Sequence, residues 1–231
     1  MAITSIIESI QQSPPPPEES TDFSILSTSI VKDSRSVNIT GAADTIWLII
    51  GAANKDSQSS WAGTLVPSGW KRVFYQHKFD KDAYGNNVGS NLCIAAWYRR
   101  LTGSEGTTTF LAAGGDRYTF NIFKISGGGG LTSGGNQNGY SRSGGISALT
   151  VPTGSKSAPV IAFANWASPV GSGFGTTTFT ATTTASEQSN DGTWRLRTYC
   201  HVYNGATSNV NFSYTSNPGS PCIMSGFWLK G

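Results

Sequence analysis

The most constraining feature of this chain is a long series of short, strand-like segments separated by turn residues. Along residues 195–203 polar and apolar side chains alternate, as in a strand that has only one face buried. Residues 46–50 and 159–164 are instead continuously apolar, which predicts central strands buried on both faces. Turn sequences such as Asn204-Gly205 stand between the segments. The pattern therefore predicts an all-β protein.

From residue 23 onward we find no helical periodicity. The predicted strands lie near residues 23–31, 36–40, 45–52, 70–79, 91–101, 107–112, 117–125, 158–166, 176–183, 193–203, 207–215 and 221–229. Residues 126–147 are rich in Gly and Ser, and we interpret them as a long surface loop within one domain. Many short strands at regular spacing predict an antiparallel β-sandwich over residues 23–231, and we expect it to be jelly-roll-like.

Residues 1–22 differ from the rest and form a predicted docking arm, helical or extended. Four isoleucines recur at helical spacing and share one face. A helix this short is marginal alone in water, so we expect that face to pack either on its own domain or on a partner. Four prolines follow, and they predict an extended polyproline II spacer. The predicted partner-binding residues are Ile3, Ile6, Ile7, Ile10, Pro14, Pro15, Pro16 and Pro17.

Charge is sparse and unevenly placed. Only 13% of residues are charged, against about a quarter in typical soluble domains. The arm contains Glu8, Glu18, Glu19 and Asp22 and no basic residue, so the remainder carries +7 within a net charge of +3. The basic residues of the domain are scattered and form no stripe, which argues against a nucleic-acid partner. No apolar segment approaches the roughly 18 residues of a membrane helix, so we expect no membrane partner.

The sequence offers little equipment for catalysis or metal binding. His77 and His201 do not stand at metal-ligand spacing, and residues 80–85 match a calcium loop only in part. Outside the arm the glutamates are Glu105 and Glu187, which do not assemble a convincing acid and base pair for glycoside hydrolysis. We therefore predict a protein that is not an enzyme, with no catalytic residues, no metal and no cofactor.

Buried thiols are the favoured interpretation of the cysteines. The three cysteines are Cys93, Cys200 and Cys222. They lie in apolar or alternating segments and their number is odd, which favours buried thiols over a disulfide framework. Such thiols suit a protein that folds in a reducing cytoplasm.

Tryptophans fall into two groups. Four lie within apolar strands and are expected in the core: Trp47, Trp97, Trp166 and Trp228. Three border predicted loops and are candidates for contact with a ligand or partner: Trp61, Trp70 and Trp194. An exposed indole at such a position can stack on a sugar ring or anchor an interface.

Several segments resemble a β-sandwich module found in virion proteins of tailed bacteriophages. Residues 66–70, VPSGW, resemble the P-x-G-W start of a strand in that module. Residues 93–103, CIAAWYRRLTG, are similar to its aromatic and basic strand with the following turn. The early buried strand 45–51, the strand 160–166 and the closing residues 226–230 complete a resemblance that spans roughly residues 40–231. The arm lies outside the module, and the Gly-rich stretch 126–147 departs from its pattern.

The resemblance implies a virion structural protein without enzymatic activity. We expect a capsid decoration protein on the virion surface, assembled in the host cytoplasm and anchored through its arm. Its expected partners are other virion proteins, either the major capsid protein or tail components. We also expect the copies to form a homo-oligomer, with a trimer favoured because multivalency strengthens a weak anchor. The alternative is a tail-fibre or receptor- and glycan-binding tail module, using residues 126–147 and the loop tryptophans.

Overall fold

The structure is a computed structural model that describes residues 24–55, 63–78, 91–126, 132–141, 146–151, 158–169, 176–178, 182–188, 194–206, 210–215 and 222–230. In these residues the chain forms fifteen strands and no helix. The strands are β1 (Ser24–Lys32), β2 (Ser36–Ile39), β3 (Ile46–Lys55), β4 (Lys71–Lys78), β5 (Asn91–Arg100), β6 (Gly106–Thr109), β7 (Arg117–Ser126), β8 (Thr132–Ser141), β9 (Ile146–Val151), β10 (Ala158–Pro169), β11 (Thr176–Thr177), β12 (Thr183–Gln188), β13 (Trp194–Ala206), β14 (Val210–Thr215) and β15 (Cys222–Lys230).

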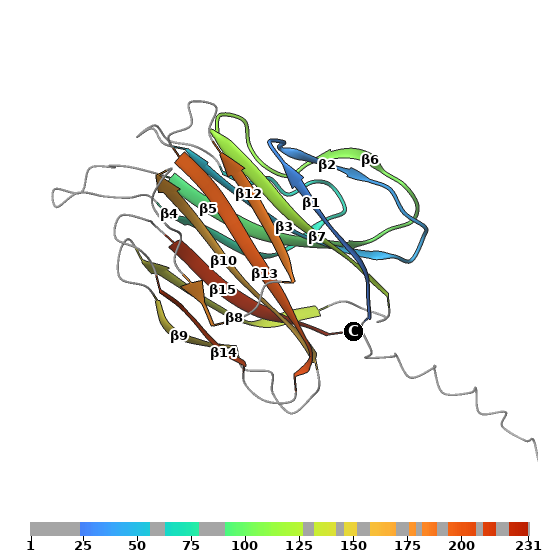
Figure 1. Ribbon diagram of the computed structural model, residues 1–231. Coiled ribbons are helices and arrows are strands. Elements are labelled where there is room, and N and C mark those ends of the chain that lie inside the picture. The colour runs from blue at the N-terminus through green and yellow to red at the C-terminus, as the bar shows by residue number, and fades with distance from the viewer. Residues whose placement is uncertain are drawn as a thin grey trace, which may run out of the picture.

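Two five-stranded antiparallel sheets pack face to face (Figure 1). The first has the strand order β1-β7-β3-β5-β4, and the second has the order β12-β13-β10-β15-β8. The predicted antiparallel β-sandwich is therefore confirmed. The chain completes the first sheet before it begins the second, whereas the strands of a jelly roll alternate between two sheets.

The two continuously apolar segments form the middle strands of the two sheets, as predicted. In β3 the side chains of Ile46, Leu48 and Ile50 face the second sheet, and Trp47 and Ile49 face the opposite side. All five are almost completely buried. A middle strand needs apolar side chains on both faces because both faces of this sheet are covered.

A smaller layer covers part of the outer face of each main sheet. On the first sheet, an apolar cluster joins residues of β3, β5 and β7 to Val37 and Ile39 of β2 and to Phe110 and Leu111 after β6. On the second sheet, Val210 of β14 packs against residues of β10 and β15. The two layers are the ribbon β2-β6 and the three-stranded sheet β11-β14-β9. The described sandwich is therefore four layers deep (Figure 1).

The interpretation of residues 126–147 as one long loop is wrong. Residues 132–141 form β8, the edge strand of the second sheet, which pairs with β15 in a register that includes Gly139 opposite Met224. Gly and Asn have low strand propensity, but backbone pairing with an ordered neighbouring strand can override propensity. Residues 183–188 also form a strand, β12, that the sequence pattern did not predict as a separate element. The predicted strand 176–183 is therefore divided between β11 and the first residue of β12.

Candidate interaction surface

The structure places Trp70 in the core, although it was a candidate for ligand contact. Its side chain is only 5% exposed, and its ring packs edge-on against Phe110 with 4.8 Å between the ring centroids. Its indole therefore presents no open face to a ligand. Trp61 and the side chain of Trp194 lie outside the described residues, as do all eight predicted partner-binding residues of the arm. Of the four predicted core tryptophans, Trp47 and Trp97 are buried and Trp228 is partly buried, and the side chain of Trp166 is not described.

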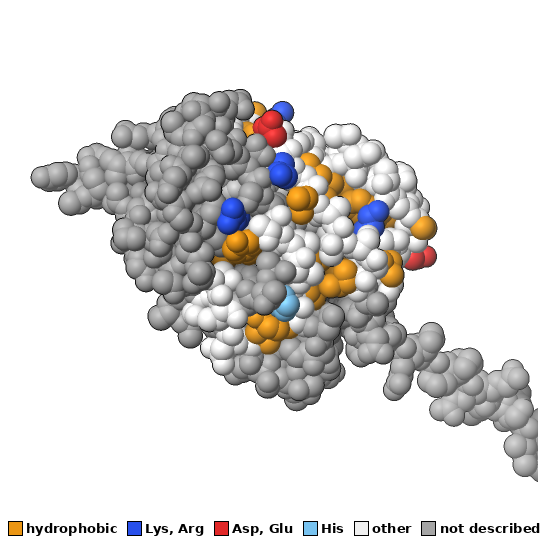
Figure 2. All heavy atoms as spheres, in the orientation of Figure 1, with side chains coloured by type: hydrophobic (Ala, Val, Ile, Leu, Met, Phe, Trp, Pro, Cys, Tyr) orange, Lys and Arg blue, Asp and Glu red, His pale blue; other side chains and the backbone are white. Residues whose placement is uncertain are grey.

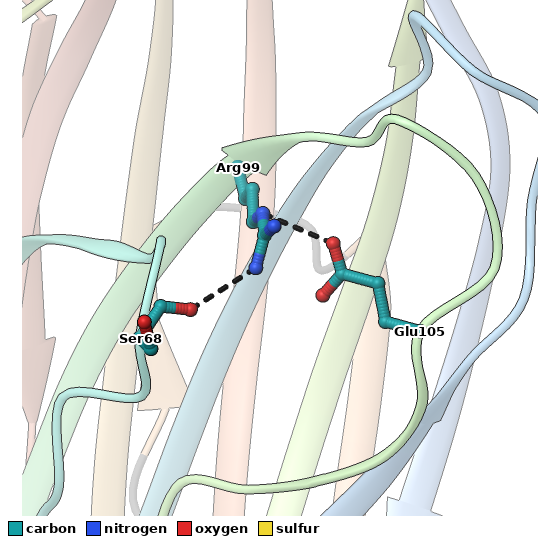
Figure 3. A network of polar contacts seen from close by, with 3 residues as sticks. All are labelled: Ser68, Arg99 and Glu105. Carbon is teal, nitrogen blue, oxygen red and sulfur yellow. Dashed lines mark hydrogen bonds and ion pairs between the residues drawn. The ribbon is translucent and has the colours of Figure 1, made fainter.

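The P-x-G-W segment, within residues 66–70, forms a tight turn that Arg99 of β5 binds. The Trp70 N–H donates to the carbonyl of Pro67 at 3.1 Å, and Gly69 has φ +78°, which only glycine adopts readily. The Arg99 guanidinium lies against Gly69, and its Nη1 donates to the Ser68 carbonyl at 3.0 Å (Figure 3). Arg99 Nε also forms an ion pair with Glu105 at 3.0 Å. The turn, β5 and the segment after β5 are therefore held together at one point.

The residues just before this turn are equally well fixed. The Leu65 N–H donates to the Phe110 carbonyl at 2.8 Å, and the Leu65 carbonyl accepts from Trp97 Nε1 at 2.9 Å. The two side chains are nevertheless exposed to solvent: Leu65 is 41% exposed and Val66 is 52% exposed. An ordered backbone thus presents two large apolar side chains to solvent.

An arginine and a tyrosine of β4 lie beside this segment. Arg72 Nη1 donates to Thr64 Oγ1 at 3.0 Å, and its guanidinium lies 4.6 Å from the centroid of the Tyr75 ring. Tyr75 is 40% exposed. Burial of part of its side chain raises the pKa of Tyr75 above its ordinary value, so the phenol is neutral at neutral pH. We call the group of Thr64, Leu65, Val66, Arg72 and Tyr75 the Leu65–Tyr75 surface.

This surface has the chemistry of a binding site. Arginine and tyrosine are the residues that most often dominate binding energy in protein interfaces, and rigid aliphatic neighbours exclude water around them. Sequence reasoning missed the surface because the alternation in β4 indicates only which residues share a face. The available signal was the pairing of an apolar dipeptide before a Pro-Ser-Gly turn with an arginine just after it.

A second group of polar aromatic residues lies on β13. Arg197 Nη1 donates to Tyr199 Oη at 3.2 Å, and the rings of His201 and Tyr203 meet edge-on at 4.3 Å between centroids. Thr182 Oγ1 lies 3.2 Å from His201 Nδ1. These side chains are partly buried, because the two tyrosines also pack on the apolar cluster of the second sheet. We call these four residues the β13 stripe; they point away from the sandwich interior.

Burial shifts the pKa values of the described cysteines and of His77. All three cysteines are buried thiols that form no disulfide, as predicted, and burial raises the pKa of each, which suppresses the reactive thiolate. Burial lowers the pKa of His77. Among the described residues no three His, Cys, Asp or Glu side chains lie close enough to hold a metal ion. The partial calcium loop at residues 80–85 lies outside the described residues.

Charges on the visible face of the molecule are sparse. In Figure 2 one acidic and one basic side chain lie side by side at the top of the view, and the other described Lys, Arg, Asp and Glu side chains are separated by uncharged atoms, with small groups of hydrophobic side chains between them. The described part of that face therefore presents no continuous charged patch.

Comparison of this chain with known protein families, with curated proteins and with solved structures finds no match. A search of the described residues for a helix able to span a membrane also finds none.

Proposed function

We propose that this chain is a non-enzymatic structural protein of a bacteriophage virion, most specifically a capsid decoration protein anchored through its N-terminal arm. The observation that carries the proposal is the packing of the two segments with the strongest resemblance to the phage module. Residues 66–70 and residues 93–103 are distant in sequence, yet they form one structural unit.

Four distinctive residues of the two segments have a place in that unit. Gly69 permits the turn, Arg99 binds the turn through the Ser68 carbonyl, and Trp97 binds the carbonyl of Leu65. Trp70 and Trp97 both pack on the Phe110 ring, at 4.8 and 5.1 Å between ring centroids. Matches that arose by chance in separate parts of a chain would not be expected to depend on one another in this way.

The remaining parts of the proposal follow from the arm and from the buried thiols. The isoleucine face of the arm binds another virion protein, with the major capsid protein favoured over tail components. Burial of an isoleucine contributes about 1.5–3 kcal/mol, and association costs consume much of the total, so several arms acting together bind far better than one. Copies therefore form a homo-oligomer, with a trimer favoured. The three cysteines are buried and form no disulfide, which suits assembly in the host cytoplasm before display on the virion surface.

The test is cosedimentation of the full-length protein with purified phage particles that lack it. The variant Ile6→Asp/Ile7→Asp places charge on the isoleucine face, and the control Thr4→Asp/Ser9→Asp places the same charge on the opposite face. We expect the wild type and the control to bind particles, and the isoleucine variant to bind at least tenfold less. Equal binding of both variants would refute the anchor. Failure of the wild-type protein to bind heads or tails would refute the virion role.

The alternative, a receptor- or glycan-binding tail module, is favoured by the β13 stripe. Neighbouring outward residues of a strand are about 6.8 Å apart, so the stripe presents a row of rings and one guanidinium to a flat ligand. Immunogold labelling of intact particles separates the two functions, because label on heads supports decoration and label on tails supports the alternative. A glycan array with the full chain and its Tyr199→Ser variant then tests binding, and equal signals from both proteins would exclude the stripe.

A further inference from the structure

The Leu65–Tyr75 surface combines exposed apolar area with an arginine that has no acidic partner among the described residues. The ion pair found in that part of the chain joins Arg99 and Glu105, whereas Arg72 contacts a hydroxyl and an aromatic ring. Strand β4 itself, KRVFYQHK, contains three basic residues and no acidic residue. A second copy of the same surface would bring like charges together, so an acidic partner is favoured over self-association.

The chain contains a segment with the complementary chemistry. Residues 14–19 read PPPPEE, four prolines followed by two glutamates, and the whole arm has no basic residue. Proline-rich segments in the polyproline II conformation dock on exposed aromatic side chains with a small entropic cost, since the extended helix is already formed. We propose that Pro14–Glu19 of this same chain docks on the Leu65–Tyr75 surface, with Glu18 and Glu19 facing Arg72 and the prolines on Tyr75, Leu65 and Val66.

The strand register shows that the arm is long enough. Ser24, the first residue of β1, pairs with Ser126 of β7. The same row of paired residues continues across the sheet to Thr45, just before β3, and to Leu101, just after β5. The Leu101 N–H donates to the Thr45 carbonyl. β1 and β4 are the two edges of the first sheet, so four strand spacings, about 19 Å, separate them.

Arg72 lies opposite Trp97, four residues along β5 from that row, which adds about 13 Å along the strand direction. Because both faces of the sheet are covered, the arm must pass around the end of the sheet, a path of about 32 Å from Ser24 to Arg72. Glu18 is six residues before Ser24, and an extended chain of that length spans about 20 Å. The long side chains of the glutamate and the arginine must close the remaining gap, so the segment between Glu18 and Ser24 is fully extended in the docked state. Binding within one chain also avoids the entropic cost of bringing two molecules together.

Docking of the prolines would fix the direction in which the isoleucine-containing part of the arm extends from the β-sandwich domain. The inference stands independently of the virion role, because it concerns only the contact between the arm and its own domain. An anchored arm with a fixed exit direction would bind a particle with less loss of conformational freedom than an unrestrained one.

Photo-crosslinking in the full-length protein tests the contact. A benzoylphenylalanine replaces Val66, and the matched control places it at Asn211, an exposed position on β14. We expect the Val66 probe to form crosslinks within one chain to residues 14–19, mapped by mass spectrometry, and the Asn211 probe to form none there. Crosslinked dimers would overturn docking within one chain, and the absence of any crosslink from Val66 to residues 14–19 would overturn the site.

Charge reversal tests the electrostatic part in the same assay. The substitution Arg72→Glu should lower the crosslink yield at least threefold, and the further change Glu18→Lys/Glu19→Lys should restore it. Arg35→Glu, at an exposed arginine outside the surface, should leave the yield unchanged. A yield that does not respond to Arg72→Glu, or that the reversed pair does not restore, would overturn the pairing of Arg72 with the two glutamates.

Discussion

Replacing Gly69 by alanine should destabilise the protein through two separable effects. Gly69 has φ +78°, a region in which an L-residue is strained. An added Cβ would also lie 2.6 Å from Nη1 and 2.7 Å from Cζ of Arg99. The guanidinium is the end of a flexible side chain, so it can move aside. By moving, it would give up the hydrogen bond to Ser68 and the ion pair with Glu105.

The expected magnitude follows from these losses. The left-handed conformation costs an alanine about 1–2 kcal/mol. The hydrogen bond from Arg99 to the Ser68 carbonyl is exposed to solvent and contributes about 1 kcal/mol, and the partly exposed ion pair contributes about 0.5 kcal/mol after solvent screening. Gly69→Ala should therefore lower the free energy of unfolding by about 3 kcal/mol. In a chain of this length that corresponds to a fall in Tm of about 6–12 °C.

Gly106 supplies a matched control. It has φ +73°, but no atom lies within 4 Å of the position that its Cβ would occupy. Gly106→Ala should therefore cost only the conformational part, about 1–2 kcal/mol. Urea unfolding followed by tryptophan fluorescence measures both variants. In an Arg99→Ala background, Gly69→Ala should cost no more than Gly106→Ala does. Equal costs of the two glycine variants in the wild-type background would refute the contact with Arg99.

Three further predictions concern the buried layers. Gly51→Ala would place a Cβ 2.5 Å from the Phe120 ring in a fully packed layer, so urea unfolding should show a loss of about 3 kcal/mol, and a loss near zero would contradict the packing. Thr198→Val removes the hydroxyl that lies 3.0 Å from the buried Thr119 hydroxyl, and it should lower the free energy of unfolding by about 1–3 kcal/mol. The double variant Thr119→Val/Thr198→Val should recover much of this loss, and no recovery would argue against the hydrogen bond. Burial lowers the pKa of His77, so folding favours its neutral form. The contribution of His77 to the free energy of unfolding is therefore complete above its unfolded pKa of about 6.5. That contribution is lost as the pH falls from the unfolded pKa to the lower folded pKa. Tm measured at pH 7.5 and pH 5.0 should therefore fall less in His77→Gln than in the wild type, and identical changes would exclude this role.

Sequence reasoning succeeded where local pattern and tertiary environment agree. The segment 46–50 is apolar on both faces, and β3 has a neighbouring strand on each side and a covering layer on each face. The alternation in residues 195–203 likewise matches β13, where Leu196, Thr198 and Cys200 are buried and the intervening residues are not. In both strands the side-chain periodicity records the burial of each face.

The misses arise where a neighbouring element, absent from any local window, decides the outcome. β8 has a turn-like composition and is a strand because β15 offers it a complete row of backbone partners. Trp70 follows a turn, which suggested exposure, but the turn directs its ring onto Phe110, which lies forty residues away in sequence. The Leu65–Tyr75 surface was missed for the same reason, since it forms only when the segment before β4 is bound by Trp97 and Phe110.

The four-layer arrangement restricts where this protein can bind anything. In the described residues most of both faces of each main sheet is covered, and the partly exposed β13 stripe is an exception on the outer face of the second sheet. Some polar groups between the sheets pair with one another, as Arg117 Nε and Asn54 Oδ1 do at 2.6 Å. Binding must then use strand edges, connecting segments, the arm or the β13 stripe. Edge strands carry backbone groups that invite unwanted pairing, and basic side chains such as those of β4 discourage it. The arm leads into β1, one edge of the first sheet, and the Leu65–Tyr75 surface lies at β4, the other edge. A proline segment laid on the β4 side would shield exposed apolar side chains at that edge, so the same contact that orients the arm would also protect the isolated protein from association.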